Sequence, residues 1–261
     1  MEIKSKKDFD LAMVNYYNTL PFTFGLKENE HFNLIMDIPS KCMGYFLSGD
    51  ADIALVPVAT LLNQEGFKII TDYCIGCVGE VRTVAIFSKS KISDIKRIYL
   101  DKDSRTSQLL VKILCRKYWE IDPVFEQKNV RELDTSDLSE DTAILMIGDK
   151  VFDAEGRFEY AYDLGEEWQK MTGLPFTFAV WIARENVPEE VISDLNKSLS
   201  IGVNDIQGVV GKNQHLDLRF NLSEYFKKHI DYRFDDGKKE SLKLYNDYAE
   251  EILEKAVSTE Y

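Results

Sequence analysis

The sequence lacks any hydrophobic segment long enough to cross a membrane, because none approaches the roughly 20 apolar residues that a spanning helix needs. The N-terminus is basic and has no apolar run before Asp10, so no secretory signal is visible. With 261 residues, 44% of them hydrophobic, the chain can bury one large core or two modest ones. We therefore expect a cytoplasmic protein without a membrane partner.

Positive charge is scarce as well. The chain has 32 Lys and Arg against 45 Asp and Glu, which gives a net charge of −13. Such a field disfavours nucleic acid and anionic membranes as main partners. A small anionic ligand is compatible with it only if local features of a site bind that ligand, since the protein as a whole repels it.

Cysteine and histidine are also few. Cys74 and Cys77 form a C-x-x-C motif, which in other contexts marks a redox pair or half of a zinc site. A tetrahedral zinc site would need two further ligands at matching spacing, and the three histidines stand alone. We predict no metal and no cofactor. The cysteines, with Cys42 and Cys115, are expected to be small buried side chains, and a C-x-x-C redox protein is the least favoured alternative.

Short apolar runs alternate with segments of helical periodicity along the chain. Residues 52–58 are almost continuously apolar, as in a parallel strand that is covered on both faces. Further strands are predicted at residues 9–14, 32–36, 81–87, 97–100, 142–147 and 174–183. Helices are predicted to begin near Thr19, Ser40, Ser107 and Pro188, and a last one near Leu242. This order indicates an α/β fold with parallel-rich mixed sheets.

Two extended segments, residues 81–87 and 176–182, bracket the middle of the chain. They resemble strands that cross between two halves of a molecule. A chain that leaves one lobe, builds a second and returns has a two-stranded hinge. We therefore predict a first lobe of residues 1–87 and 180–261, a second of residues 88–179, and a ligand cleft between them.

In two places an apolar strand leads directly into a polar cluster that opens a helix. The first cluster is residues 15–21 and the second is residues 101–107. A helix start presents unpaired N–H groups and the positive end of the helix dipole, so it suits an anion. Ligands of open α/β sheets bind at the carboxyl ends of strands, where both clusters lie. Together the two clusters predict a doubly anionic small molecule.

Several short motifs follow one another in a characteristic order. They are residues 17–21, 52–58, 81–83, 104–107, 147–149, 163–168, 172–176, 178–181 and 230–233. In this order they resemble the chorismate dehydratase family of the futalosine route to menaquinone. The run from Asp163 to Trp181 is the most specific part of the resemblance, which covers nearly the whole chain.

The resemblance implies a two-lobed fold like that of the type 2 periplasmic binding proteins, used as an enzyme. It implies dehydration of chorismate to 3-enolpyruvylbenzoate, with loss of the ring hydroxyl and the neighbouring ring proton. Neither a metal nor a redox cofactor is needed for this chemistry. Chorismate carries two carboxylates, in agreement with two anion sites. The chain departs from the family pattern at Asn15 and Thr83, where serine is usual, and at Tyr17, where leucine is commoner.

The first group of candidate residues lies at the first cluster and at a crossing strand. Asn18 matches the family's most characteristic position and is predicted to be catalytic, although asparagine is also a common helix cap. Thr83 is a second catalytic candidate, or a threonine chosen for strand propensity. Asn15 and Arg82 are predicted to bind substrate. In a regular strand, however, Arg82 points away from the face of Thr83, which favours an ion pair between lobes instead.

The second group forms the anion site of the second cluster. Ser104, Thr106 and Ser107 offer hydroxyls, and Arg105 could hold a carboxylate through two hydrogen bonds. The alternative is plain helix capping by Ser104 or Thr106. Asp149 follows a buried strand and is predicted to bind substrate, with a turn or hinge role as its alternative.

No residue is an obvious general base, since no histidine lies in a motif and no carboxylates are paired. We therefore hypothesise that one of the substrate's own carboxylates helps to remove the proton. Two other functions stay open: a small-anion solute-binding protein of the same fold, and the sibling enzyme that acts on cyclic dehypoxanthine futalosine. The oligomeric state cannot be inferred from the sequence.

Overall fold

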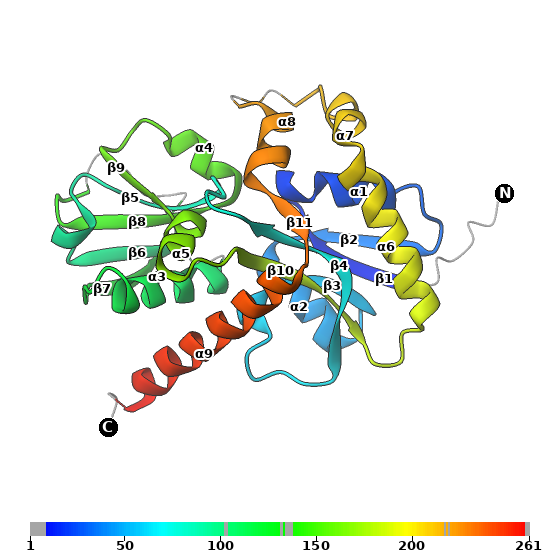
Figure 1. The fold of residues 1–261 in the computed structure, drawn as a ribbon, viewed down its shortest axis with the longest axis horizontal. Coiled ribbons are helices and arrows are strands. Elements are labelled where there is room, and N and C mark those ends of the chain that lie inside the picture. Colours follow the sequence, from blue (N-terminus) through cyan, green and yellow to red (C-terminus); the bar gives the residue numbers. More distant parts are fainter. Residues whose placement is uncertain are drawn as a thin grey trace.

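The computed structural model describes residues 9–101, 104–130, 133, 138–216, 218 and 220–258, without the side chains of Ser40 and residues 255–258. Figure 1 shows two α/β regions side by side, joined by extended segments. Each region is built around one sheet. None of the helices within these ranges is both long and apolar enough to cross a membrane.

The first region contains a six-stranded sheet in the order β11-β4-β10-β3-β1-β2. Its strands are β1 (Phe9–Val14), β2 (Phe32–Asp37), β3 (Ile53–Pro57), β4 (Phe67–Cys77), β10 (Phe176–Arg184) and β11 (Asp231–Arg233). β1 pairs in parallel with β2 and β3, whereas β10 is antiparallel to β3 and β4. The accompanying helices are α1 (Leu20–Leu26), α2 (Pro39–Ser48), α6 (Glu189–Asn204) and α7 (Ile206–Lys212). Because β1 and β3 are parallel, their carboxyl ends meet at the edge that faces the second region.

The second region contains a five-stranded sheet in the order β7-β6-β8-β5-β9. Its strands are β5 (Val84–Ser88), β6 (Arg97–Asp101), β7 (Val124–Lys128), β8 (Thr142–Ile147) and β9 (Tyr160–Asp163). β6 is parallel to β7 and β8, and β5 is antiparallel to β8 and β9. The helices are α3 (Arg105–Lys117), α4 (Val151–Ala154) and α5 (Leu164–Thr172). The predicted α/β class with mixed sheets is confirmed. The sheets are not parallel-rich, however, because among the described strands four pairs are parallel and five are antiparallel.

The chain passes between the sheets at positions that differ from those expected. β5 pairs entirely within the second sheet, so the outward crossing lies in residues 78–83. β10 pairs along its whole length within the first sheet, so the return lies in residues 173–175. Apolar strands alone do not reveal which sheet they join, because both sheets bury them. We propose residues 9–77 and 176–258 as the first lobe and residues 84–172 as the second.

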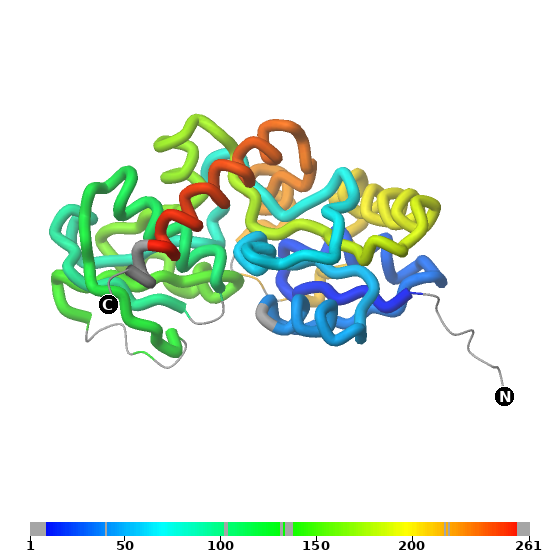
Figure 2. The backbone as a smooth tube through the Cα atoms, turned by 90° about the horizontal axis from the view of Figure 1, so that it is seen from below, coloured from blue at the N-terminus to red at the C-terminus, as the bar shows by residue number. Residues whose placement is uncertain are grey.

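The last helix, α9 (Asp236–Ser258), runs from the junction of the two regions along the second one, as its red tube shows in Figure 2. It contacts β10 of the first lobe and α3 of the second. Trp168 donates its indole N–H to Ser241 on α9 at 3.0 Å, and Tyr245 on α9 donates to the backbone carbonyl of Thr106 at 3.1 Å. α9 therefore braces the junction between the lobes.

The ends of α2 and the C-x-x-C motif show how individual residues behave in the fold. Gly49 ends α2 in the left-handed conformation, with φ of 89°, which glycine adopts without a steric penalty. Ser40, however, lies inside α2, because the helix already begins at Pro39. The C-x-x-C motif lies on β4, and its two cysteines, like Cys42 and Cys115, are buried and free. The cysteines are thus core side chains, as predicted.

Candidate active site

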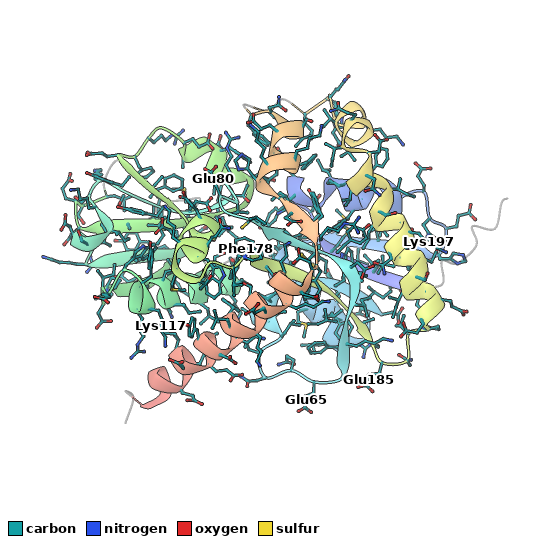
Figure 3. All side chains as sticks on the ribbon, viewed as in Figure 1. Glu65, Glu80, Lys117, Phe178, Glu185 and Lys197 are labelled. Carbon is teal, nitrogen blue, oxygen red and sulfur yellow. The ribbon has the colours of Figure 1, made fainter. Side chains whose placement is uncertain are left out.

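A cavity of about 80 Å³ lies between the lobes, at the carboxyl ends of β1, β3 and β8. The predicted site residues Asn18, Thr83, Ser104, Thr106 and Ser107 all line it. The remaining lining residues are Val14, Tyr16, Pro39, Pro57, Ile75, Val81, Val84, Ile147, Gly148, Phe178 and Ala179. Figure 3 labels Phe178 on β10, where the two regions meet. Every side chain in this set is neutral, so an anion here would be bound by hydroxyls, amides and helix starts.

The first predicted cluster brings Asn18 to this cavity. Asn18 lies in a single 3-10 turn, Tyr17–Thr19, directly after β1. Thr19 donates its hydroxyl hydrogen to the backbone carbonyl of Val14 at 2.9 Å, which ties the turn to the end of the strand. The Oδ1 atom of Asn18 is buried and accepts no hydrogen bond from the described part of the protein. Because a buried polar atom without a partner is costly, this oxygen is poised for a ligand donor.

Tyr232, which we did not predict as a site residue, holds Asn18 in place. Its buried hydroxyl donates to the backbone carbonyl of Asn18 at 2.9 Å. Its ring packs edge-on against Phe22, with ring centroids 5.3 Å apart. Tyr232 lies more than two hundred positions beyond Asn18 in the chain, so no local pattern could reveal the contact. The motif at residues 230–233 was the sole sequence signal for it.

Asn15, the other candidate of this cluster, does not reach the cavity. It is exposed, and its backbone N–H donates to the carbonyl of Asp37 at 3.1 Å. Tyr16 takes its place in the cavity wall and lies against Gly148. Gly148 has φ of 68°, and a Cβ there would lie 3.4 Å from the Tyr16 ring, so glycine suits both its backbone and the close approach.

The second predicted cluster is the start of α3. Ser104 is the N-cap: its Oγ accepts the N–H of Ser107 at 3.2 Å and donates to the Ser107 hydroxyl at 2.8 Å. The Oγ1 of Thr106 accepts the N–H of Ala59 from the first lobe at 3.2 Å. The capping alternative for Ser104 is thus present in the structure. The hydroxyls of Ser104, Thr106 and Ser107 border the cavity, but each already takes part in a hydrogen bond within the protein.

Arg105 is not brought to the cavity. It is the first residue of α3, its side chain is exposed, and it is absent from the cavity lining. Helix geometry explains this position, because successive side chains on a helix point in different directions. When Ser104, Thr106 and Ser107 face inward, Arg105 faces out.

Arg82 also points away from the cavity. It lies before β5 and has φ of 66°, so its direction is not set by the alternation of a regular strand. Its Nε and Nη2 donate to the carboxylate of Glu155 at 2.8 and 3.1 Å. This hydrogen bonding raises the pKa of Arg82. The guanidinium carbon also lies 5.3 Å from the ring centroid of Phe152 and 5.9 Å from that of Phe220. Arg82 therefore connects residues of the two lobes at the crossing, which is the expected alternative to substrate binding.

Thr83 faces the cavity, buried at 2% exposure. Its backbone carbonyl accepts the N–H of Gly148 at 2.7 Å. Its hydroxyl lies 3.2 Å from the hydroxyl of Tyr225, a residue that we did not predict. Tyr225 is the first residue of a π-helical turn, Tyr225–His229, and such turns occur frequently at functional sites. No spacing in the sequence connects these two residues.

Asp149 lies outside the neutral cavity. It lines a larger, more open cavity of about 810 Å³ together with Lys150, Asp153, Arg157 and further residues. Burial raises the pKa of its carboxyl to about 7, and a hydrogen bond from the Tyr17 N–H partly opposes that rise. Because Tyr17 belongs to the first lobe and Asp149 to the second, this contact lies across the junction. The geometry supports the hinge alternative for Asp149.

The four cysteine thiols are buried and hold their protons at neutral pH. Burial raises the pKa of Cys42 and Cys115 to about 12, and that of Cys74 and Cys77 further still. A thiol of such high pKa carries almost no thiolate at neutral pH, which is the nucleophilic form. Among the described residues, no cluster of three or more His, Cys, Asp or Glu side chains could hold a metal ion.

The two sheets, the double crossing and the neutral cavity between them define an α/β protein of the periplasmic-binding-protein-like class. The chain belongs to the menaquinone biosynthesis family, whose model matches residues 9–251. It is 28% identical to the chorismate dehydratase of Thermus thermophilus over 206 residues, which are 71% of this chain and 74% of that protein.

Solved structures show the same fold. A protein from Archaeoglobus fulgidus superposes with a TM-score of 0.70 at 14% identity, covering 93% of this chain and 96% of its own. The aliphatic sulphonate binding protein of Escherichia coli superposes with a TM-score of 0.62 at 10% identity, covering 97% of this chain and 89% of its own. A Candida albicans gene product, described as having the generic periplasmic binding protein fold, gives 0.57 at 10% identity, covering 94% of each chain.

Proposed function

We propose that this protein dehydrates chorismate to 3-enolpyruvylbenzoate in futalosine-dependent menaquinone biosynthesis, in the cytoplasm. The family membership and the Thermus thermophilus relative support this reaction. The observation that carries the proposal is the buried, unpartnered Oδ1 of Asn18 in a neutral cavity. An oxygen in this position can accept the hydrogen of the substrate's ring hydroxyl, which is the group to be lost.

The reaction removes one water from the substrate. The neighbouring ring carbon gives up its proton, and the electrons of that C–H bond form the new ring double bond. The bond from the ring carbon to the hydroxyl oxygen breaks, and the hydroxyl leaves with that electron pair and takes up one proton to become water. The ring becomes aromatic, which provides the driving force. The contribution of Asn18 is to orient the leaving hydroxyl, and that of Thr83 is to bind a carboxylate.

The two carboxylates of chorismate would be stabilised without a cationic side chain. The start of α3 contributes the dipole of a 13-residue helix and the hydroxyls of Ser104, Thr106 and Ser107. In a cavity of low polarity, hydrogen bonds to an anion are strong. Specificity for a carboxylate would therefore come from the position of neutral donors.

None of the residues that line the cavity is an acid or a histidine. This supports the hypothesis that a carboxylate of the substrate itself accepts the ring proton. Asp149 has a pKa of about 7, which suits a general base, but it lines the larger cavity instead. Asp149→Asn should therefore keep turnover, and loss of activity with intact chorismate binding would overturn the hypothesis.

The volume of about 80 Å³ is small compared with the roughly 300–1,000 Å³ of pockets for drug-sized ligands. From this small volume we infer that the lobes are closed on each other. Entry of chorismate would require the lobes to separate, which breaks the contact of Ala59 with Thr106 and that of Tyr17 with Asp149.

The test is incubation of the purified protein with chorismate, without added metal or nucleotide, followed by mass spectrometry and ultraviolet absorbance. Enzyme-dependent loss of one water to give the aromatic enolpyruvyl ether is the expected result. Tight binding of unchanged chorismate would instead identify a small-anion binding protein. Conversion of cyclic dehypoxanthine futalosine, with chorismate untouched, would identify the sibling enzyme.

A further inference from the structure

We propose that Tyr225 is a positioning residue that fixes the Thr83 hydroxyl as a hydrogen-bond donor toward a carboxylate of the ligand. This inference rests on the proposed function for the identity of the ligand. Tyr225 lies outside the cavity lining. A hydroxyl can either donate or accept in a given hydrogen bond, and the proposal makes Thr83 the acceptor toward Tyr225 and the donor toward the ligand, an arrangement called its polarity below.

The first step is the hydrogen bond of Tyr225 itself. Its side chain is completely buried, at 0% exposure. Within the described residues, the Thr83 Oγ1 at 3.2 Å is the one hydrogen-bond partner of its hydroxyl. A buried hydroxyl keeps its hydrogen bonded to an acceptor, since an unpaired donor is costly. Burial also raises the pKa of Tyr225, so the phenol retains its proton at neutral pH. The distance fits either hydroxyl as the donor. Thr83 faces the cavity, where a ligand can accept its hydrogen, whereas Tyr225 has no other acceptor among the described residues, so Tyr225 is assigned as the donor and Thr83 as the acceptor.

The second step follows for Thr83. A hydroxyl has one hydrogen to donate, and the hydrogen of Thr83 is not used toward Tyr225 when Tyr225 is the donor. The Thr83 side chain lines the neutral cavity, where the described groups offer it no other hydrogen bond. Its hydrogen is thus available to a ligand acceptor. A carboxylate oxygen suits this geometry better than a ligand hydroxyl, because it accepts and does not donate.

The third step is the rigidity of Tyr225. Its ring packs edge-on against Phe152 of the second lobe and Phe220 of the first, with centroids 5.5 and 5.7 Å apart. Phe152 and Phe220 in turn stack on each other at 3.7 Å. A ring enclosed from both lobes is held in place when the lobes are closed, so the polarity of Thr83 is set in the closed protein.

The experiment is a double-mutant cycle with chorismate, using Thr83→Val, Tyr225→Phe and the pair. A hydrogen bond to a charged group is worth enough that Thr83→Val should raise KM by about 10-fold to 100-fold. Tyr225→Phe keeps the ring and should raise KM by roughly 3-fold to 10-fold, with kcat changed less. In the Thr83→Val background it should have no further effect, because its action passes through Thr83.

Tyr232→Phe is the matched control, since it also removes one buried tyrosine hydroxyl but acts on Asn18. Its effect should multiply with that of Thr83→Val. Tighter binding of chorismate by Tyr225→Phe would overturn the proposal, because it would show that Thr83 donates to Tyr225. An equal effect of Tyr225→Phe in both backgrounds would also overturn it.

Thr83→Ser provides a further measurement in case Tyr225→Phe fails to fold, as judged by thermal melting. Serine keeps the hydroxyl, so its KM should stay within about threefold of wild type, whereas valine should not. Equal KM values for serine and valine variants would overturn the proposal. A folded wild-type protein that neither binds nor converts chorismate would overturn the proposed function, and this inference with it.

Discussion

The two helix starts that border the neutral cavity are built in opposite ways. At the first, Asn18 presents an oxygen with no partner among the described residues, while its backbone is held by Tyr232. At the second, Ser104 and Thr106 already have partners, one within α3 and the other across the junction. The first helix start therefore leaves an oxygen available to a ligand, whereas the hydroxyls at the second already bond to their own helix or to the opposite lobe.

This difference suggests that recognition of the ligand and closure of the lobes depend on different helix starts. The unpaired oxygen of Asn18 gains a hydrogen bond only when a ligand supplies a donor, so it selects for a hydroxyl. The Thr106 hydroxyl loses nothing in the empty closed state, because Ala59 satisfies it. We therefore propose that the first helix start acts in the chemical step and that the second affects how readily the lobes close. Each side can be altered separately.

The largest effect is expected from Asn18→Asp, which breaks the recognition side. It places a carboxylate in a neutral cavity opposite a dianion, and burial of an unpaired charge is strongly unfavourable. We expect turnover of chorismate to fall by about 100-fold or more. Asn15→Asp is the matched control, because Asn15 is exposed three positions earlier and should change turnover less than about twofold. Equal losses in both variants would remove Asn18 from the site.

A smaller effect is expected from Thr106→Val, which removes the hydrogen bond between the lobes at the second helix start. The variant leaves the Ala59 N–H without its partner in the closed state, at a cost of about 1–3 kcal/mol. We expect KM to rise by roughly tenfold while kcat changes little. Thr106→Ser keeps the acceptor and should restore the wild-type KM. A fall in kcat at constant KM would place Thr106 in the chemical step.

Asp149 should make the closed protein sensitive to pH. Its folded-state pKa of about 7 lies above the ordinary 3.8, so its stabilising contribution is present below about pH 4 and is lost as the pH rises through 7. An asparagine side chain cannot ionise, so Asp149→Asn should gain stability over wild type between about pH 5 and pH 8. Because Asp149 is partly exposed, we expect roughly 1–2 kcal/mol in thermal or urea unfolding. Parallel pH profiles would contradict this account.

The smallest effect is expected from Arg105→Ala. The exposed guanidinium lies outside the cavity lining, and exposed charges contribute little. We expect KM for chorismate to change by less than about twofold. An increase of tenfold or more would show that Arg105 reaches the ligand, as the sequence led us to expect.

Features that depend on neighbouring residues in the chain could be predicted from the sequence, whereas features that depend on distant residues could not. Strand ends and helix caps are local, so the placement of Asn18 and Ser104 at one cavity could be inferred from polar clusters after apolar runs. The outward direction of Arg82 was favoured by strand alternation, although its positive φ of 66° was not foreseen. Arg105 was expected at the ligand because of its charge, whereas the structure places it on the exposed side of the start of α3.

The residues that hold the site could not be inferred in the same way. Tyr225 and Tyr232 reach Thr83 and Asn18 across more than a hundred positions of sequence. Hydrogen bonds of this kind depend on the packing of a complete fold and leave no local pattern. The sheet to which β5 belongs was missed for a related reason, because pairing partners are nonlocal.

The most direct test of the account is a crystal structure of the Asn18→Ala variant with chorismate. We predict electron density for unchanged chorismate in the neutral cavity, with its ring hydroxyl at the position vacated by the Asn18 amide and a carboxylate at Thr83. Chorismate bound in the larger cavity beside Asp149 and Arg157, with the neutral cavity empty, would contradict the account.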